Sequence, residues 1–327
     1  MKRVGVFTSG GDAPGMNACI RAVVRGAIYH GAEVYGIRYG YNGMIKGDIV
    51  EMNSHSVSNI IQKGGTILKS ARSTEFMTSE GRKKAFDQLQ AYGIEGLVCI
   101  GGDGSFRGAK VFYEEHSMPI VGAPGTIDND IYGTDFTIGF DTAVNTAIEA
   151  IDKIRDTADS HDRIFFVEVM GRDSGYIAIR SGICGGAELV MVPEMSTSVE
   201  DVIDALKREK RRSKTSSIII VAEGGEAGSA VEVAAKVKTK LKEADIRVTT
   251  LGHVQRGGAP SAKDRILASR MGLSAIEGLL NGRKNVMAGV MKDELVFTPI
   301  EHAITIKKSL SRDLLRMVDI FNNRYKK

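Results

Sequence analysis

The chain has 327 residues, and 44 Lys and Arg against 40 Asp and Glu give it a formal net charge of +4. Hydrophobic residues make up 43% and charged residues 26%, which excludes a disordered chain, a collagen and a disulfide-rich miniprotein, while the length allows two domains. The 38 glycines indicate that the backbone approaches other groups closely at several places.

Short apolar, β-branched segments alternate with segments of helical periodicity along the chain. The apolar segments predict strands buried on both faces at 4–8, 32–37, 96–100, 119–123, 163–169, 189–192, 217–222 and 247–251. The periodic segments predict helices at 16–30, 79–92, 105–116, 140–158, 199–212, 229–243 and 261–281. This alternation predicts an α/β fold with two mainly parallel sheets, and because no linker separates two halves, we expect the chain to cross between lobes more than once.

Six of the predicted strands are followed by glycine together with polar or charged residues. These loops are TSGGDAPG (8–15), GGDGS (101–105), PGTIDND (124–130), MGRDSG (170–175), EGG (223–225) and GHVQRGG (252–258). Ligands of parallel α/β sheets bind just beyond the carboxyl ends of the strands. The six loops together therefore predict a ligand-binding site, whereas any one of them alone also fits an ordinary turn.

Two of these loops suit phosphate groups. Gly10 and Gly15 have the spacing of a P-loop, but Met16 and Asn17 replace its Lys-Ser/Thr, so only backbone amides before a helix are left to bind phosphate. In the second loop, the carboxylate of Asp103 would repel a phosphate unless a cation lay between them. Asp103 is therefore a candidate Mg²⁺ ligand, and an Asp-Gly turn is the alternative.

The third loop carries two carboxylates, Asp128 and Asp130, that are two residues apart. One of them could accept a proton from an alcohol while the other organises metal or water, which is the division of roles that phosphoryl transfer needs. An Asx-turn is the alternative. Cationic side chains in or near the loops could bind phosphate, and these are Arg72, Arg163, Arg172, Arg247, Arg256 and His253.

Other features restrict the class of protein. Arg21 and Arg25 share one helix face and 207–214 is strongly basic, but no aromatic residues are interleaved, so we expect solvated helix faces and no nucleic-acid binding. Zinc-hydrolase, nucleophile-elbow and Cys/His metal motifs are absent. Cys19, Cys99 and Cys184 are too few and too scattered for disulfides, so we expect them to be buried.

The chain has no apolar stretch of the ~18 residues that a membrane span needs. It also runs from Met1-Lys2-Arg3 directly into a predicted strand, without the core of a signal peptide. We therefore expect a cytoplasmic protein that does not bind a membrane.

Taken in order, the loops resemble those of the bacterial ATP-dependent 6-phosphofructokinase family. The matching segments are TSGGDAPGMN, GGT, SAR, GGDGS, PGTIDND, GFDTA, SHDR, VEVMGR, GGAE, AEGG and LGHVQRGG. The resemblance implies two Rossmann-like αβα lobes and transfer of the γ-phosphoryl group of MgATP to the 1-hydroxyl of fructose 6-phosphate. It also implies a nucleotide-binding lobe of residues 1–138 with 252–302, and a sugar-phosphate-binding lobe of residues 139–251 with 303–327.

The resemblance assigns roles to residues of the loops. Asp128 would be the base, and Thr126, Asp130, Arg72 and Arg172 would surround the transferred group. The ATP site would be formed by Gly11, Arg72, Ser73, Gly102, Asp103, Gly104 and Ser105, with Asp103 on Mg²⁺. The substrate would be contacted by Thr126, Ile127, Asp128, Arg163, Met170, Gly171, Arg172, Glu223, Arg247, His253, Val254, Gln255 and Arg256.

The resemblance also implies a homotetramer, in which Arg163 and Arg247 reach fructose 6-phosphate in a neighbouring subunit. An effector site for ADP or phosphoenolpyruvate would include Arg21, Ala22, Val23, Val24, Arg25, Arg155, Gly186, Ala187, Glu188, Arg212, Lys214, Thr215 and Ser216. Ser54 and Ser216 stand where many relatives have basic residues, so we expect weak or altered regulation.

Three alternatives stay open. A pyrophosphate-dependent relative would tend to carry Asp in place of Gly104 and Lys in place of Gly125, so the two glycines favour ATP. A kinase of another acceptor, similar to NAD kinases, would explain GGDGS but not HVQRGG, MGR and SHDR. A non-catalytic nucleotide sensor would be expected to lack a carboxylate at 103, 128 or 130, and all three are present.

Overall fold

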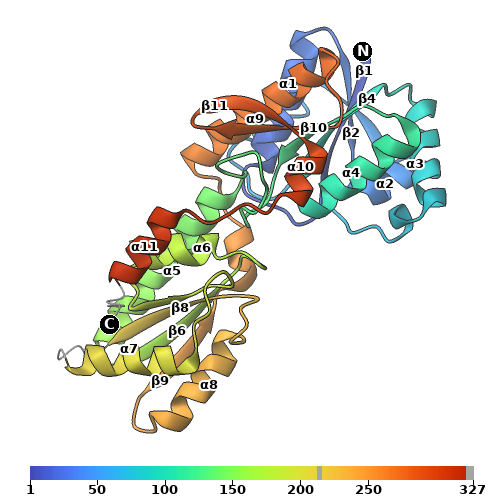
Figure 1. Ribbon diagram of the computed structural model, residues 1–327. Helices are drawn as coiled ribbons and strands as arrows, with labels where there is room; N and C mark the ends of the chain where they lie inside the picture. Colours follow the sequence, from blue (N-terminus) through green and yellow to red (C-terminus); the bar gives the residue numbers. More distant parts are fainter. Residues whose placement is uncertain (212–215, 322–327) are drawn as a thin grey trace. The chain divides into compact units, whose positions relative to one another are not determined.

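The computed structural model describes residues 1–211 and 216–321, and within them the chain forms two compact units (Figure 1). Unit 1 comprises residues 1–127, 131–142 and 256–308, and unit 2 contains the described parts of 128–130, 143–255 and 309–327. The chain therefore passes between the units more than once. These bounds do not identify the ligand of either unit, so the assignment of a nucleotide lobe and a sugar-phosphate lobe stays a prediction.

Unit 1 is built on one seven-stranded sheet. In spatial order its strands are β11 (Glu294–Pro299), β10 (Val286–Met291), β5 (Ile120–Pro124), β4 (Gly96–Gly101), β1 (Arg3–Ser9), β2 (Glu33–Ile37) and β3 (Ile49–Met52). The five central strands are parallel, and β3 and β11 are antiparallel to their neighbours. Ser9, Gly101 and Pro124 are register partners, so the loops after β1, β4 and β5 leave the sheet at the same level.

Three strands were not predicted from the sequence, namely β3, β10 and β11. The β10–β11 hairpin turns through Lys292 and Asp293, which both have positive φ, at 50° and 66°. Two-residue hairpins of this kind usually carry Asn-Gly or Asp-Gly. The turn was missed because Lys-Asp lacks that signature.

Helices cover both faces of this sheet (Figure 1). One face carries α1 (Met16–Tyr29) and α9 (Ala262–Leu280), which pack on each other. The other face carries α2 (Gly40–Lys46), the short η1 (Glu75–Met77), α3 (Ser79–Ala91), α4 (Asp103–His116) and α10 (Ile300–Thr305). Each parallel strand of unit 1 is therefore buried between two helical layers, which explains its continuous apolar sequence.

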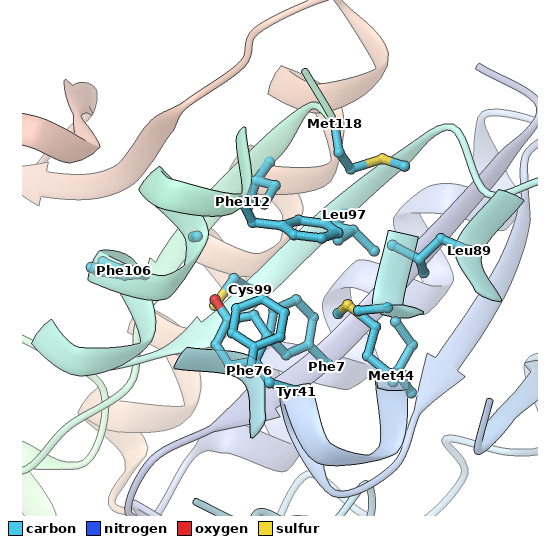
Figure 2. Packing of buried hydrophobic residues seen from close by; sticks show 14 of the residues in the cluster. Phe7, Tyr41, Met44, Phe76, Leu89, Leu97, Cys99, Phe106, Phe112 and Met118 are labelled. Atoms are coloured by element: carbon cyan, nitrogen blue, oxygen red, sulfur yellow. The ribbon is translucent and has the colours of Figure 1, made fainter. Parts of the chain in front are cut away.

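The core under α4 is aromatic (Figure 2). The ring of Tyr41 stacks on Phe76 with centroids 3.9 Å apart and meets Phe7 edge-on at 5.0 Å. The Tyr41 hydroxyl is buried and donates a hydrogen bond to the carbonyl oxygen of Ser105 at 2.7 Å. The core therefore fixes the first turn of α4, where Asp103 and Ser105 lie.

Unit 2 contains a four-stranded, fully parallel sheet. Its strands are, in spatial order, β7 (Leu189–Met191), β8 (Ser217–Ala222), β6 (Ile164–Val169) and β9 (Ile246–Thr250). In Figure 1, one face carries α5 (Phe140–Asp159), α6 (Tyr176–Cys184) and α11 (Arg312–Phe321), and the other carries α7 (Val199–Arg211) and α8 (Ala230–Lys240). The predicted α/β class with two mainly parallel sheets is confirmed.

One strand is less buried than the sequence predicts. The segment 247–251 was expected to be covered on both faces, but β9 is an edge strand that pairs only with β6. Arg247 and Val248 are exposed in this chain. The β-branched sequence of β9 therefore does not indicate burial, and that expectation is wrong.

Expectations drawn from composition hold in part. Cys19 and Cys99 are buried, and burial raises the pKa of the Cys99 thiol to about 12. Cys184 is exposed, contrary to expectation, because it is the last residue of α6.

In the described part of the chain, no helix combines the length and the apolar character needed to cross a membrane.

The aromatic core of unit 1 gives a test of the packing. Leu89 of α3 has no exposed surface and lies in this core (Figure 2), whereas Leu273 of α9 is 41% exposed. We expect Leu89→Ala to lower the free energy of unfolding by about 2–5 kcal/mol and Leu273→Ala to lower it by less than about 1 kcal/mol. Urea unfolding followed by circular dichroism measures both. Equal losses would contradict the described packing of α3.

Candidate active site

The loops after β1 and β4 come together in unit 1. Ideal Cβ atoms built on Gly10 and Gly101 would lie 3.3 Å and 2.5 Å from the Ser105 Oγ, so the hydroxyl lies against both backbones. Gly10 also has a φ of +84°, which glycine adopts readily. The Ser105 Oγ is buried and has no hydrogen-bond partner among the described protein atoms. A buried hydroxyl of this kind can bind a polar ligand atom.

Asp103 is the first residue of α4 and its side chain is 33% exposed. Its Oδ2 accepts a hydrogen bond from the Arg107 Nε at 2.8 Å, and the Arg107 Nη2 donates to the carbonyl oxygen of Ile304 at 3.0 Å. Within residues 1–211 and 216–321, no group of three His, Cys, Asp or Glu side chains could hold a metal ion. One partly exposed carboxylate suits a cation whose other ligands are phosphate oxygens and water.

The ends of β4 and β5 also lie side by side. The Gly125 N–H donates to the Gly101 carbonyl oxygen at 3.0 Å, and the Thr137 hydroxyl donates to the Thr126 carbonyl oxygen at 2.6 Å. A Cβ on Gly104 would meet no atom within 4 Å, so there is open space beside this part of the loop. The backbone at Gly104 is therefore accessible to a ligand.

The loop after β1 contacts an arginine of unit 1. The Arg256 Nη1 donates to the Asp12 carbonyl oxygen at 3.2 Å, and a Cβ on Gly11 would lie 2.6 Å from the same nitrogen. Any side chain at Gly11 would therefore displace the Arg256 guanidinium.

Two other residues were expected at a nucleotide. Arg72 is exposed and Ser73 is half-buried.

In unit 2, Asp128 lies beside Arg172. The carboxylate of Asp128 is 5% exposed, and its Oδ2 is 3.7 Å from the Arg172 Nε, which is an ion pair without a direct hydrogen bond. The Ser174 hydroxyl donates to the Asp128 carbonyl oxygen at 3.2 Å. The loop that follows β6 therefore contacts both the backbone and the side chain of Asp128.

The loop after β6 is held by a carboxylate. The Glu223 Oε1 accepts hydrogen bonds from the N–H groups of Gly171 at 3.2 Å and Arg172 at 2.9 Å. Arg172 has a φ of +52°, a left-handed conformation that is costly for a residue with a Cβ. The two hydrogen bonds from the loop to Glu223 compensate for this cost and fix the backbone that carries the Arg172 side chain.

Two other arginines of unit 2 share one carboxylate. The Arg163 Nε lies 2.9 Å from the Asp245 Oδ2, and the Arg247 Nε lies 3.0 Å from its Oδ1. The hydrogen bond from Arg163 and the charges of both arginines hold the pKa of Asp245 below its usual value. The carboxylate of Asp245 thus brings Arg163 and Arg247 together.

The remaining residues expected at the sugar phosphate differ in exposure. His253 and Val254 are exposed, whereas Met170 and Gln255 are buried. Ile127 has no exposed surface, so only its backbone could meet a ligand. Asp130 is half-buried.

The residues expected at an effector site are described in each unit separately. In unit 2, the Arg155 Nη2 donates to the carbonyl oxygens of Gly185 and Gly186, and its Nη1 lies 3.6 Å from the Glu188 Oε1, next to the buried Ala187. The Ser216 hydroxyl donates to the carboxylate of Asp159. Arg212, Lys214 and Thr215 lie outside the described residues.

On α1 of unit 1, Arg25 is exposed and Arg21 and Ala22 are half-buried. Val23 and Val24 were also expected at the effector site, but both have no exposed surface and lie in the core. Neither valine can present a side chain to a ligand on this helix. Ser54 is exposed, and its carbonyl oxygen accepts a hydrogen bond from the Ser58 hydroxyl.

Sequence reasoning missed Asp264, which has no exposed surface and accepts hydrogen bonds from Gly139 and Thr142. Its sequence signal was the Ser-x-x-Asp pattern at Ser261, which is typical of the start of a helix. It also missed Arg107, because an arginine on a helix is usually solvated.

In unit 1, the glycine loops at aligned strand ends and the partly exposed Asp103 carboxylate suit a nucleotide with its cation. In unit 2, the buried Asp128 beside Arg172 suits phosphoryl transfer. The class of protein that these features indicate is a nucleotide-dependent phosphoryl transferase of α/β type. The family model described as "Phosphofructokinase" matches residues 3–279. The chain belongs to the phosphofructokinase family.

Two bacterial relatives are similar over nearly their whole length. The chain is 61% identical over 324 residues to a protein of Cytophaga hutchinsonii named ATP-dependent 6-phosphofructokinase, with 99% of both chains covered. It is 59% identical over 320 residues to ATP-dependent 6-phosphofructokinase 1 of Thermus thermophilus, with 98% of this chain and 99% of that protein covered. The prediction of the family is confirmed.

A solved structure of phosphofructokinase from Saccharomyces cerevisiae superposes with a TM-score of 0.87 at 35% identity. The match covers 98% of this chain and 48% of the yeast chain, so this chain spans about half the length of that relative. The predicted phosphofructokinase fold is confirmed.

The left-handed backbone at Arg172 gives a test of the loop geometry. We expect Arg172→Gly to be more stable than Arg172→Ala by about 1 kcal/mol, because glycine adopts a φ of +52° without the Cβ penalty. Thermal unfolding of the two variants measures the difference. For Lys207 in α7, Lys207→Ala should be more stable than Lys207→Gly, because alanine is the better helix former. If alanine were also the more stable residue at 172, the described loop would be incorrect.

Proposed function

We propose that the chain is an ATP-dependent 6-phosphofructokinase, which phosphorylates fructose 6-phosphate at its 1-hydroxyl and forms fructose 1,6-bisphosphate and ADP in glycolysis. The observation that carries the proposal is the buried Asp128 carboxylate beside Arg172. The full-length similarity to bacterial proteins named ATP-dependent 6-phosphofructokinase supports the donor and the acceptor.

Asp128 acts as the general base. It accepts the proton of the 1-hydroxyl while that oxygen bonds to the γ-phosphorus, and the bond from this phosphorus to the bridging oxygen of ADP breaks. Burial of Asp128 keeps water away from the carboxylate, and Arg172 stabilises negative charge that develops on the transferred group. Thr126, Asp130 and Arg72 complete the surroundings of that group.

The nucleotide binds to the loops after β1 and β4. Gly104 leaves open space for phosphate oxygens beside its backbone, and Gly11 and Gly102 supply backbone of the same two loops. The Ser105 hydroxyl supplies a donor that has no partner among the described protein atoms. Arg72 and Ser73 contact the same nucleotide.

The chemistry at Asp103 fits Mg²⁺. Asp103 would hold the cation through its carboxylate, with the remaining ligands taken from the nucleotide and from water. When bound there, Mg²⁺ lowers the negative charge of the phosphates that the sugar hydroxyl approaches. The Arg107 guanidinium keeps the Asp103 carboxylate oriented.

The sugar phosphate binds through cationic and backbone groups of the other loops. Arg163 and Arg247 have forked guanidinium groups that suit its 6-phosphate, and they serve the site of a neighbouring subunit in a homotetramer. The other contacts come from Thr126, Ile127, Asp128, Met170, Gly171, Arg172, Glu223, His253, Val254, Gln255 and Arg256.

Regulation by ADP or phosphoenolpyruvate would use the basic groups Arg21, Arg25, Arg155, Arg212 and Lys214, together with backbone at 186–188. The Ser216 hydroxyl is engaged by Asp159 and supplies no positive charge, and Ser54 also lacks one. Losing one charged hydrogen bond costs about 1.5–3 kcal/mol of binding, so we expect weak or altered regulation. A cytoplasmic location stays a prediction of the sequence.

The role of Asp128 is tested by Asp128→Asn. We expect kcat to fall by at least ~10² while ATP binding is unchanged, because the amide cannot accept the hydroxyl proton. An assay coupled to fructose 1,6-bisphosphate formation measures kcat. Asp173→Asn, in the exposed part of the Arg172 loop, is the matched control and should leave kcat within about two-fold. Near-normal turnover of Asp128→Asn would remove Asp128 from the role of base.

The identity of the phosphoryl donor is tested by Gly104→Asp. The space beside Gly104 admits a carboxylate sterically, but its charge would repel a nucleotide phosphate there. We therefore expect KM for ATP to rise at least ~10-fold, with KM for fructose 6-phosphate nearly unchanged. Gly104→Asn is the uncharged control of similar size. If the wild-type chain used pyrophosphate and not ATP, or phosphorylated NAD and not fructose 6-phosphate, the proposed function would be wrong.

A further inference from the structure

Asp264 is a fully buried carboxylate that no step of the proposed reaction uses. It lies in the first turn of α9, where its own N–H donates to the Ser261 hydroxyl at 3.1 Å. Its Oδ1 accepts from the Gly139 N–H at 2.9 Å, and its Oδ2 accepts from the Thr142 N–H at 2.8 Å and the Thr142 hydroxyl at 2.5 Å. One side chain of α9 thus accepts hydrogen bonds from three donors, which belong to Gly139 and Thr142 at the start of α5.

A carboxylate in this position is costly unless it is fully hydrogen-bonded. Burial raises the pKa of Asp264, and the hydrogen bonds from Thr142 and Gly139 oppose that change. The Thr142 hydroxyl also accepts from the Ser261 N–H at 2.9 Å, and the Ser261 hydroxyl donates to the Asp141 Oδ2 at 2.8 Å. The cluster therefore ties residues 139–142 to the start of α9 at several points.

The segment held by Asp264 packs on the loop after β1. A Cβ on Gly139 would lie 2.7 Å from the Ala13 Cβ and 3.2 Å from the Pro14 carbonyl oxygen, so the Gly139 backbone lies close to both residues. A Cβ on Gly15 would lie 2.7 Å from the Ile138 Cγ2 and 3.7 Å from the Asp264 Cβ. Residues 13–15 therefore rest directly against the segment that Asp264 anchors.

We propose that Asp264 is a positioning residue for the nucleotide, because it fixes residues 138–142 as the support of the loop that carries Gly11 and leads into α1. The inference rests on the proposed function, which places nucleotide phosphates at this loop. Asp264 does not touch the nucleotide. Its effect on binding passes through Gly139 to Ala13 and Pro14.

The variant Asp264→Asn keeps the size of the side chain and changes its hydrogen bonding. One carboxylate oxygen becomes an NH₂ group, which then faces either the Gly139 N–H or the donors of Thr142. In either orientation the NH₂ group faces at least one N–H donor that then loses its acceptor, so the position of residues 139–142 against residues 13–15 must change. We expect the dissociation constant of ATP and its KM to rise about ten-fold, while KM for fructose 6-phosphate changes less than two-fold.

The control separates positioning from general loss of stability. Ile276 is a fully buried residue of the same helix that packs near Gly26, at the other end of α1 from residues 13–15. We expect Ile276→Val to lower the melting temperature without changing the dissociation constant of ATP. A second variant, Thr142→Val, removes one hydrogen-bond donor to Asp264 and should raise the dissociation constant of ATP about three-fold. This variant keeps the test available if Asp264→Asn does not fold.

Equilibrium ATP binding, both KM values and the melting temperature are measured for the wild type and the three variants. The positioning role is supported if the dissociation constant of ATP rises for Asp264→Asn or Thr142→Val and does not rise for Ile276→Val. Unchanged ATP binding in the folded Asp264 and Thr142 variants, or an equal rise for Ile276→Val, overturns it. A wild-type chain that does not phosphorylate fructose 6-phosphate with ATP would instead overturn the proposed function.

Discussion

The parallel register of β1, β4 and β5 is the constraint on which the arrangement of the loops in unit 1 depends. Ser9, Gly101 and Pro124 are partners across the three strands, so three loops start at one level of the sheet. A Cβ on Gly101 would lie 2.7 Å from the Ser9 carbonyl oxygen, and a Cβ on Gly10 would lie 3.3 Å from the Ser105 hydroxyl, so the ends of β1 and β4 can come this close only where side chains are missing. The high glycine content of the chain is thus partly a packing requirement at strand ends.

Two carboxylates in this protein orient backbone segments. Glu223 accepts two N–H groups of the loop that carries Arg172, and Asp264 accepts two N–H groups of the segment that supports residues 13–15. In both places the backbone lacks a regular ladder of hydrogen bonds, and an acidic side chain supplies the acceptors instead. The Arg172 loop and the start of α5 therefore keep a defined shape where regular backbone hydrogen bonds are missing.

The sequence was sufficient to predict the central strands, because strands buried between two helical layers are continuous and apolar. It was not sufficient for β10 and β11, whose Lys-Asp turn has no glycine, or for the exposure of β9, which depends on its place at the sheet edge. Asp103 and Asp128 could be proposed as site residues from the sequence because a carboxylate is unusual beside glycine at a strand end. The contacts of Asp264 could not be predicted, since its partners Gly139 and Thr142 are more than a hundred residues away in the chain.

A crystal structure of the protein with ADP, Mg²⁺ and fructose 6-phosphate would test the assignment of the reaction to Asp128. We expect the sugar 1-hydroxyl to lie about 2.6–3.2 Å from the Asp128 carboxylate, with the nucleotide phosphates against the backbone of residues 102–105. A sugar bound elsewhere, or an Asp128 carboxylate that turns away from the hydroxyl while both ligands are in place, would contradict the proposed chemistry.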